Sequence, residues 1–157
     1  MKMAASVRRL AAAMMFIGGM ALATSARAEA PTCTLYEIAA SRADKPSIDP
    51  SLAPLASKLK RPPLSSWNVF AMLTKVSGAF EVMQSKTFKL KRSTANIVLR
   101  EVQVTGKTRY SFSVAVDDET GKRVVDTKYS IDAGDYVVIG RSVGTDEGLL
   151  LAIGGCR

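Results

Sequence analysis

Apolar and polar residues alternate along most of the second half of the chain. Tyr110, Phe112, Val114 and Val116 take every second position, and polar or small residues stand between them. The same alternation returns over residues 125–131. A period of two residues is typical of a β-strand with one buried face, so the pattern predicts strands in this region.

Further strands are predicted on either side of this region. Residues 34–40 and 86–91 alternate in the same way, whereas residues 136–139 and 149–153 are short and almost continuously apolar. Residues 66–76 are apolar on both faces and rich in β-branched and aromatic residues, which favours a strand buried on both sides.

Two irregularities are expected within this pattern. In the strand predicted for residues 96–105, the apolar positions change face at Arg100 and Glu101, which indicates a β-bulge. Asp49 followed by Pro50 is typical of the start of a helix. Pro54 limits that helix to a short or irregular one. The apolar residues at helical spacing around it are Ile48, Leu52, Leu55 and Leu59.

The number and spacing of the strands predict the fold class. About eight short strands, turns every 8–12 residues or so and one short helix near the start are typical of an all-β, antiparallel β-sandwich. The turns include an acidic hairpin over residues 117–122. A β-barrel has a similar pattern and stays open as an alternative at this point.

The first 28 residues differ from the rest. Lys2, Arg8 and Arg9 precede an apolar run over residues 10–23, and small residues at Ala26 and Ala28 follow. This order predicts a secretory signal peptide over residues 1–28 and one β-sandwich domain over residues 29–157. No later stretch is apolar enough to span a membrane, so we expect a periplasmic or extracellular protein.

The chain has two cysteines, Cys33 and Cys156, and both follow the predicted cleavage site. In an exported protein an even number of cysteines predicts pairing, and two cysteines allow one intramolecular bridge. A bridge between the two ends of the mature chain contributes up to about 5 kcal/mol on the chain-entropy model. Lipid attachment at Cys33 is the alternative, although the preceding Ala-Pro-Thr fits a lipoprotein signal poorly.

The composition argues against several chemistries. The chain contains no histidine, the commonest general base and metal ligand. The Gly140–Gly144 segment matches G-x-S-x-G, but a nucleophile elbow requires a following helix and a histidine partner. Asp117, Asp118 and Glu119 could in principle bind calcium, but their spacing favours a solvated hairpin tip. We therefore expect no catalytic residues, no metal site and no cofactor.

Basic residues form the most prominent candidate binding feature. Removing the predicted signal peptide, which has four basic residues and no acidic one, lowers the net charge from +8 to +4. This mild excess gives no reason to expect nucleic-acid binding. Two groups of basic residues are candidates for an anionic partner, although outward lysines also protect sheet edges. They are Lys58, Lys60 and Arg61, and Lys86, Lys89, Lys91 and Arg92.

One resemblance rests on two stretches of sequence. Leu59–Asn68 reads Leu-Lys-Arg-Pro-Pro-Leu-Ser-Ser-Trp-Asn, and Gly148–Ile153 reads Gly-Leu-Leu-Leu-Ala-Ile. With the order of elements between them, the chain resembles a group of small exported bacterial proteins of unassigned activity. The resemblance implies export and a sandwich fold, and it transfers no functional residues.

Three functions are consistent with the sequence. The first hypothesis is a non-enzymatic binding or structural protein of the cell envelope, whose partner is an envelope protein or an anionic surface polymer. The second is a binder of an anionic polymer or lipid surface through the basic residues. The third is a carboxylate-based enzyme that acts on glycans, although no acidic pair stands out.

Overall fold

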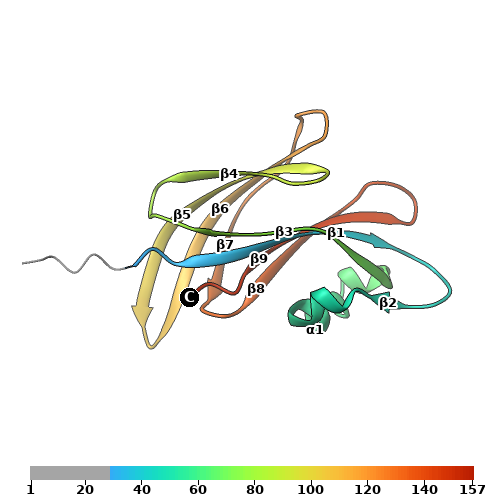
Figure 1. Ribbon diagram of the computed structural model, residues 1–157, viewed down its shortest axis with the longest axis horizontal. Coiled ribbons are helices and arrows are strands. Elements are labelled where there is room, and N and C mark those ends of the chain that lie inside the picture. The colour runs from blue at the N-terminus through green and yellow to red at the C-terminus, as the bar shows by residue number, and fades with distance from the viewer. Residues whose placement is uncertain (1–28) are drawn as a thin grey trace, which may run out of the picture.

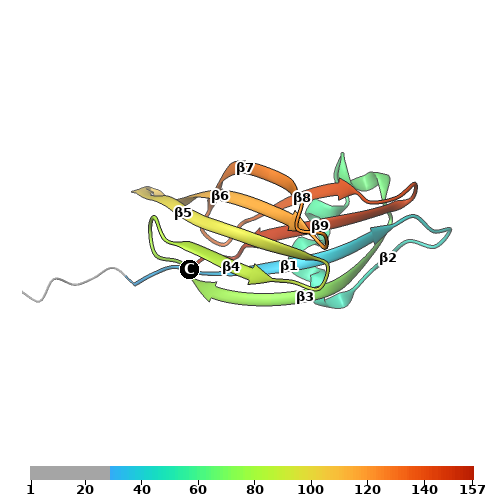
Figure 2. The ribbon, with the colours of Figure 1, turned by 90° about the horizontal axis from the view of Figure 1, so that it is seen from above.

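The computed structural model describes residues 29–157, so the predicted signal peptide lies outside the described residues. The described chain forms two β-sheets that pack face to face, with a short helical segment beside one of them (Figure 1). Figure 2 shows that the strands of both sheets run along the length of the molecule. The predicted all-β sandwich is therefore confirmed, and the strands belong to two separate sheets rather than to a barrel.

The larger sheet has five strands in the order β2-β3-β1-β9-β8. Its first and last long strands in sequence, β1 and β9, lie side by side and antiparallel at its centre. β2 pairs parallel with β3, whereas the other pairs are antiparallel. The strands are β1 (Thr32–Ser41), β2 (Ser47–Ile48), β3 (Val69–Ala79), β8 (Tyr136–Ser142) and β9 (Glu147–Gly154).

The smaller sheet is an antiparallel meander of four strands in the order β4-β5-β6-β7. The register between β5 and β6 shifts between Leu99 and Glu101, which confirms the bulge predicted from the change of apolar face. The strands are β4 (Ser85–Lys89), β5 (Ser93–Thr105), β6 (Lys107–Asp118) and β7 (Arg123–Asp132).

The main core lies between the two sheets. Its alternating residues on β6, namely Tyr110, Phe112, Val114 and Val116, are all buried, as their period of two predicted. The Cys33–Cys156 disulfide belongs to the same core and joins the start of β1 to the residues after β9. The predicted bridge is therefore present.

A second, smaller core lies on the outer face of the five-stranded sheet. The helical segment over it consists of the 3₁₀ helix Pro50–Leu55, the single α-helical turn α1 (Ala56–Leu59) and the 3₁₀ turn Leu64–Ser66. The Asp49 side chain accepts a hydrogen bond from the N–H of Ser51, so the predicted helix start is confirmed. The buried apolar residues of this segment are Leu52, Leu55, Leu59 and Leu64.

The prediction for residues 66–76 is wrong in two respects. Ser66 ends the last 3₁₀ turn, and β3 begins at Val69. On β3 Phe70 is buried, while the other residues are half-buried or exposed. The helical segment is too short to cover the whole outer face of the sheet, so β3 has one buried face at most along its length.

A buried carboxylate joins the two sheets. Glu37 on β1 is fully buried, and its oxygens accept hydrogen bonds from the turn between β4 and β5. The N–H of Lys91 donates to Oε2 at 2.7 Å, and the N–H of Arg92 donates to Oε1 at 3.0 Å. The Ser93 hydroxyl donates to Oε1 at 2.7 Å, and the Thr74 hydroxyl donates to Oε2 at 3.3 Å. The carboxylate thus fixes the turn against β1 and β3.

Candidate binding groove along strand β8

Strand β8 is an edge of the five-stranded sheet and pairs with β9 alone. In an antiparallel ladder, alternate residues direct their N–H and C=O groups toward the neighbouring strand. The N–H of Val143 donates to the carbonyl of Glu147, and the N–H of Gly155 donates to the carbonyl of Asp135. Odd-numbered residues of β8 therefore bond to β9, and even-numbered residues direct their backbone groups outward.

Three of these outward residues are available to a ligand. The fourth outward residue, Tyr136, follows Asp135 directly, and its N–H contributes to lowering the pKa of that carboxyl group. Within residues 29–157, no hydrogen bond outside the β8–β9 ladder engages the backbone of Val138, Gly140 or Ser142. Their N–H and C=O groups form an unpaired row along about 15 Å of strand.

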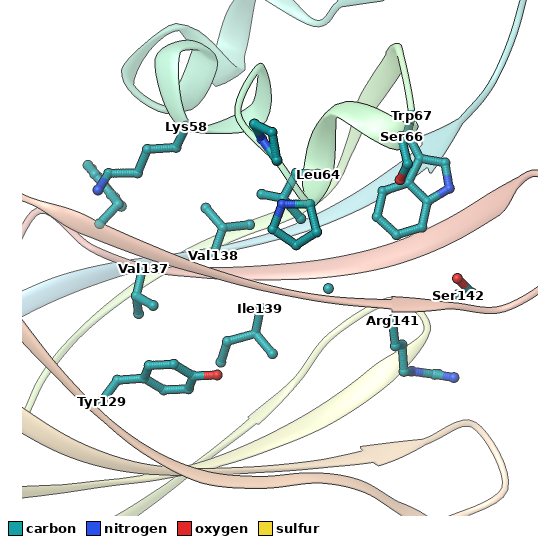
Figure 3. A pocket seen from close by; sticks show the side chains of 14 residues that line it. Lys58, Leu64, Ser66, Trp67, Tyr129, Val137, Val138, Ile139, Arg141 and Ser142 are labelled. Atoms are coloured by element: carbon teal, nitrogen blue, oxygen red, sulfur yellow. The ribbon is translucent and has the colours of Figure 1, made fainter.

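A groove with a volume of about 560 Å³ follows this row. All seven residues of β8 line it. Lys58, Leu64 and Trp67 lie on one side of the groove, and Tyr129 and Arg141 lie on the other (Figure 3). The edge strand is thus the floor of a groove that has walls on both sides. The residues of the first wall, which we call the Pro-Trp wall, are Lys58, Pro62, Pro63, Leu64, Ser66 and Trp67.

Two glycines allow the Pro-Trp wall to approach the sheet. A Cβ atom on Gly148 would lie 2.5 Å from the Trp67 ring, and one on Gly140 would lie 3.1 Å from Leu64. Both distances are shorter than ordinary van der Waals contact, so a side chain at either position would push the wall outward. Trp67 therefore packs on the outer face of the sheet as a core residue, and one part of its half-buried ring lines the groove.

A basic side chain lies at each end of the groove. At one end, the Lys58 ammonium lies 2.9 Å from the Asp135 carboxylate. Its hydrogen bond is the main cause that lowers the pKa of Asp135, and the charge of Arg61 contributes as well. At the other end, no ion pair within residues 29–157 includes Arg141.

Asp118 is an acidic group near Arg141, and the charge of Arg141 contributes to lowering its pKa. The main cause of that lowering is the hydrogen bond from the Thr120 hydroxyl, and the N–H groups of Thr120 and Lys122 also donate to the carboxylate. All three bonds end on Oδ1 of Asp118, and no ion pair within residues 29–157 joins Asp118 to Arg141, so the guanidinium can still bind a carboxylate of a ligand.

The structure does not bring the seven predicted basic residues together. Lys58 lies on α1, and Lys60 and Arg61 directly follow α1, on the outer face of the five-stranded sheet. Lys86 and Lys89 lie on β4, and Lys91 and Arg92 lie in the turn after it, on the other sheet. In Figure 1, α1 and β4 are on opposite sides of the molecule.

In the group on and after β4, the side chains of Lys86 and Arg92 already have partners within the protein. The Lys86 ammonium donates to the carbonyl of Ala79 at 2.9 Å and lies over the rings of Phe80 and Phe88. Arg92 pairs with Glu119 at 3.0 Å. Among the predicted basic residues, Lys58 lines the β8 groove, while Lys60 lines a separate hollow on the other side of the helical segment.

The other predicted motifs have structural roles. Gly140 and Ser142 lie on β8, and the next element is β9, so no helix follows the serine. Asp118 caps the acidic hairpin turn. In the described part of the chain, no three acidic, cysteine or histidine residues are placed to hold a metal ion. No described helix has the length and apolar character needed to cross a membrane.

Sequence reasoning missed the groove because its main feature is a row of unpaired backbone N–H and C=O groups, which has no side-chain pattern. The apolar run at residues 136–139 predicted β8, but nothing in it distinguishes an edge strand from a central one. The signal nearest to the site was Gly140 together with Trp67, whose contact depends on the tertiary structure. No family model, curated protein or solved structure matches the chain.

Proposed function

We propose that the protein is a non-enzymatic, exported binding protein of the cell envelope, periplasmic or extracellular, that holds an extended polypeptide segment of a partner protein along β8. The observation that carries the proposal is the row of unpaired N–H and C=O groups at Val138, Gly140 and Ser142, at the floor of a walled groove. An added strand satisfies such a row with main-chain hydrogen bonds, and the walls then contact its side chains.

The disulfide and the predicted signal peptide support export. Structural disulfides persist in oxidising compartments, and Cys33 and Cys156 form one here. With Cys33 in this bridge, its sulfur is not available for lipid attachment.

Three acidic residues lack the raised pKa that a carboxylate-based enzyme would need. A carboxyl group that serves as a general acid needs a raised pKa. The carboxyl groups of Asp49, Asp118 and Asp135 have lowered pKa values, with the largest cause in each a hydrogen bond that the carboxylate accepts. No acidic residue is among those that line the groove.

The separation of the basic residues favours a polypeptide over an anionic polymer. A polyanion bound through all seven would need to contact both sheets, whereas the groove on β8 has a continuous floor and two walls. Binding of an anionic polymer or lipid surface through the basic residues is therefore the alternative, and the experiment below distinguishes it from strand addition.

Site-specific photocrosslinking in the native host tests the proposal. A photoreactive phenylalanine derivative replaces Ser142, which is exposed on β8, or Lys89, which is exposed on β4. We expect a covalent polypeptide adduct from position 142 and none from position 89. A second substitution, Val138→Pro, should abolish the adduct, because proline removes an outward N–H and leaves the β8–β9 ladder intact.

The matched control for this second substitution is Val138→Ala, which removes side-chain atoms but keeps the N–H. The adduct should survive it. Adducts from position 89 alone, or an adduct from position 142 that Val138→Pro leaves unchanged, would refute strand addition on β8. Thermal unfolding of each variant verifies that it is folded.

A further inference from the structure

The chemistry of the groove indicates which kind of segment it holds, and this inference rests on the proposed function. We propose that the partner strand alternates apolar residues with other residues. We propose also that it carries an acidic side chain opposite Arg141. The side chains of a strand point alternately to its two sides. A strand added to β8 would therefore direct every second side chain toward the Pro-Trp wall and the others toward Tyr129 and Arg141.

The two walls differ in chemistry, which makes the alternation specific. Four of the six residues of the Pro-Trp wall are apolar, and its polar members are Lys58 and Ser66. The apolar ones are Pro62, Pro63, Leu64 and Trp67. Prolines and a tryptophan present rigid apolar surface, so they favour an apolar side chain and lose little conformational entropy when they contact it. Gly140 lies beneath this wall and is exposed, so no side chain from β8 separates a partner strand from the wall at that point.

The other wall ends at a free guanidinium. Arg141 alternates with Gly140 and Ser142, so its side chain lies on the opposite face of β8 from the Pro-Trp wall (Figure 3). It has no ion-pair partner in residues 29–157. Arginine binds a carboxylate with two parallel hydrogen bonds, and this pairing fixes the register of a bound strand as well as its charge.

Charge at the opposite end supports the same preference. Lys58 is paired with Asp135, and Arg61 lies close enough to affect the pKa of that carboxyl group. Because the Lys58 charge is balanced by Asp135 and Arg61 does not line the groove, the acidic preference rests mainly on Arg141, with Lys58 and Arg61 adding a weaker attraction for an acidic segment.

A phage-displayed library of random seven-residue segments tests this inference on the purified, oxidised mature protein. Selection on the unmodified protein, with counter-selection on the Val138→Pro variant, retains peptides that need the outward N–H. We expect at least a tenfold enrichment of Asp or Glu at one position, with apolar residues at the two flanking positions. Selection on Arg141→Glu should replace that acidic preference by Lys or Arg.

Each other outcome contradicts the inference in a recognisable way. Enriched peptides without an acidic position, or an acidic position unaffected by Arg141→Glu, would refute the pairing with Arg141. Acidic peptides that lack alternation and are displaced equally by dextran sulfate would indicate a general anion site. If no peptide is enriched over Val138→Pro, the inference fails.

The crosslinking experiment separates this failure from that of the proposed function. A polypeptide adduct at position 142 that Val138→Pro abolishes would keep strand addition, even if the library showed no acidic preference. If Val138→Pro does not fold, Ser142→Pro takes its place in the counter-selection, because Ser142 is exposed and also has an outward N–H. Ser142→Ala, which keeps that N–H, is then the control.

Discussion

Glutamine in place of Glu37 removes one acceptor oxygen from the buried carboxylate without changing the size of the side chain. The carboxylate accepts hydrogen bonds from the backbone N–H groups of Lys91 and Arg92 and from the hydroxyl groups of Ser93 and Thr74. The amide oxygen can take the Oε2 position, where it accepts from the N–H groups of Lys91 and Arg92, while the NH₂ group donates to the Ser93 hydroxyl, which turns to accept. The N–H of Arg92 then loses its contact at the Oε1 position, and every remaining bond has a neutral partner in place of a charged one.

The magnitude follows from these contacts. A hydrogen bond to a charged group contributes about 1.5–3 kcal/mol, whereas one between neutral groups contributes about 0.5–1.5 kcal/mol. Because the bonds to Glu37 become bonds between neutral groups, we expect Glu37→Gln to lower the free energy of unfolding by about 2–3 kcal/mol. This is a large part of the roughly 5–15 kcal/mol typical of a small protein.

Urea unfolding followed by circular dichroism measures the effect. Glu119→Gln is the matched control, because Glu119 forms an exposed ion pair with Arg92 at the same turn. Such pairs contribute only about 0–1 kcal/mol. If Glu37→Gln destabilised the protein no more than Glu119→Gln, the carboxylate would not be what fixes the β4–β5 turn, and the reasoning would be refuted.

Three further predictions concern stability. Replacing both Cys33 and Cys156 with serine should lower the free energy of unfolding by about 3–5 kcal/mol, since the bridge closes a loop with a sequence separation of 123; equal urea midpoints with and without the bridge would contradict this. Gly148→Ala should cost about 1–3 kcal/mol through overpacking and should shift the fluorescence of the single tryptophan. Gly144→Ala is its control, because a Cβ there meets its neighbours at ordinary contact distance, 3.7 Å, and an unchanged spectrum for both would refute the contact. Asp118 has a lowered folded-state pKa, so the stability that it contributes is complete above its ordinary value of 3.8 and is lost as the pH falls through the folded-state value. The melting temperature should therefore fall on acidification below about pH 4, and Asp118→Asn should reduce that fall; an equal fall in both proteins would show that Asp118 has no part in it.

The period of the apolar residues was sufficient to predict most of the fold. Strands with one buried face follow from alternation, because successive side chains point to opposite sides of a sheet. The bulge near Arg100 and the short helix after Asp49 were predicted for the same kind of local reason, since each depends on neighbouring residues alone. The disulfide followed from the number of cysteines, which left one possible intramolecular partner for each.

The tertiary structure alone decided which strand is an edge and what lies beside it. Residues 136–139 and 149–153 look alike in sequence, yet β9 is buried at the centre of its sheet and β8 lies at the edge. Strand order depends on pairings between distant segments, which a local pattern does not encode. The same is true of Glu37, because its donors Lys91, Arg92 and Ser93 follow it by more than fifty residues.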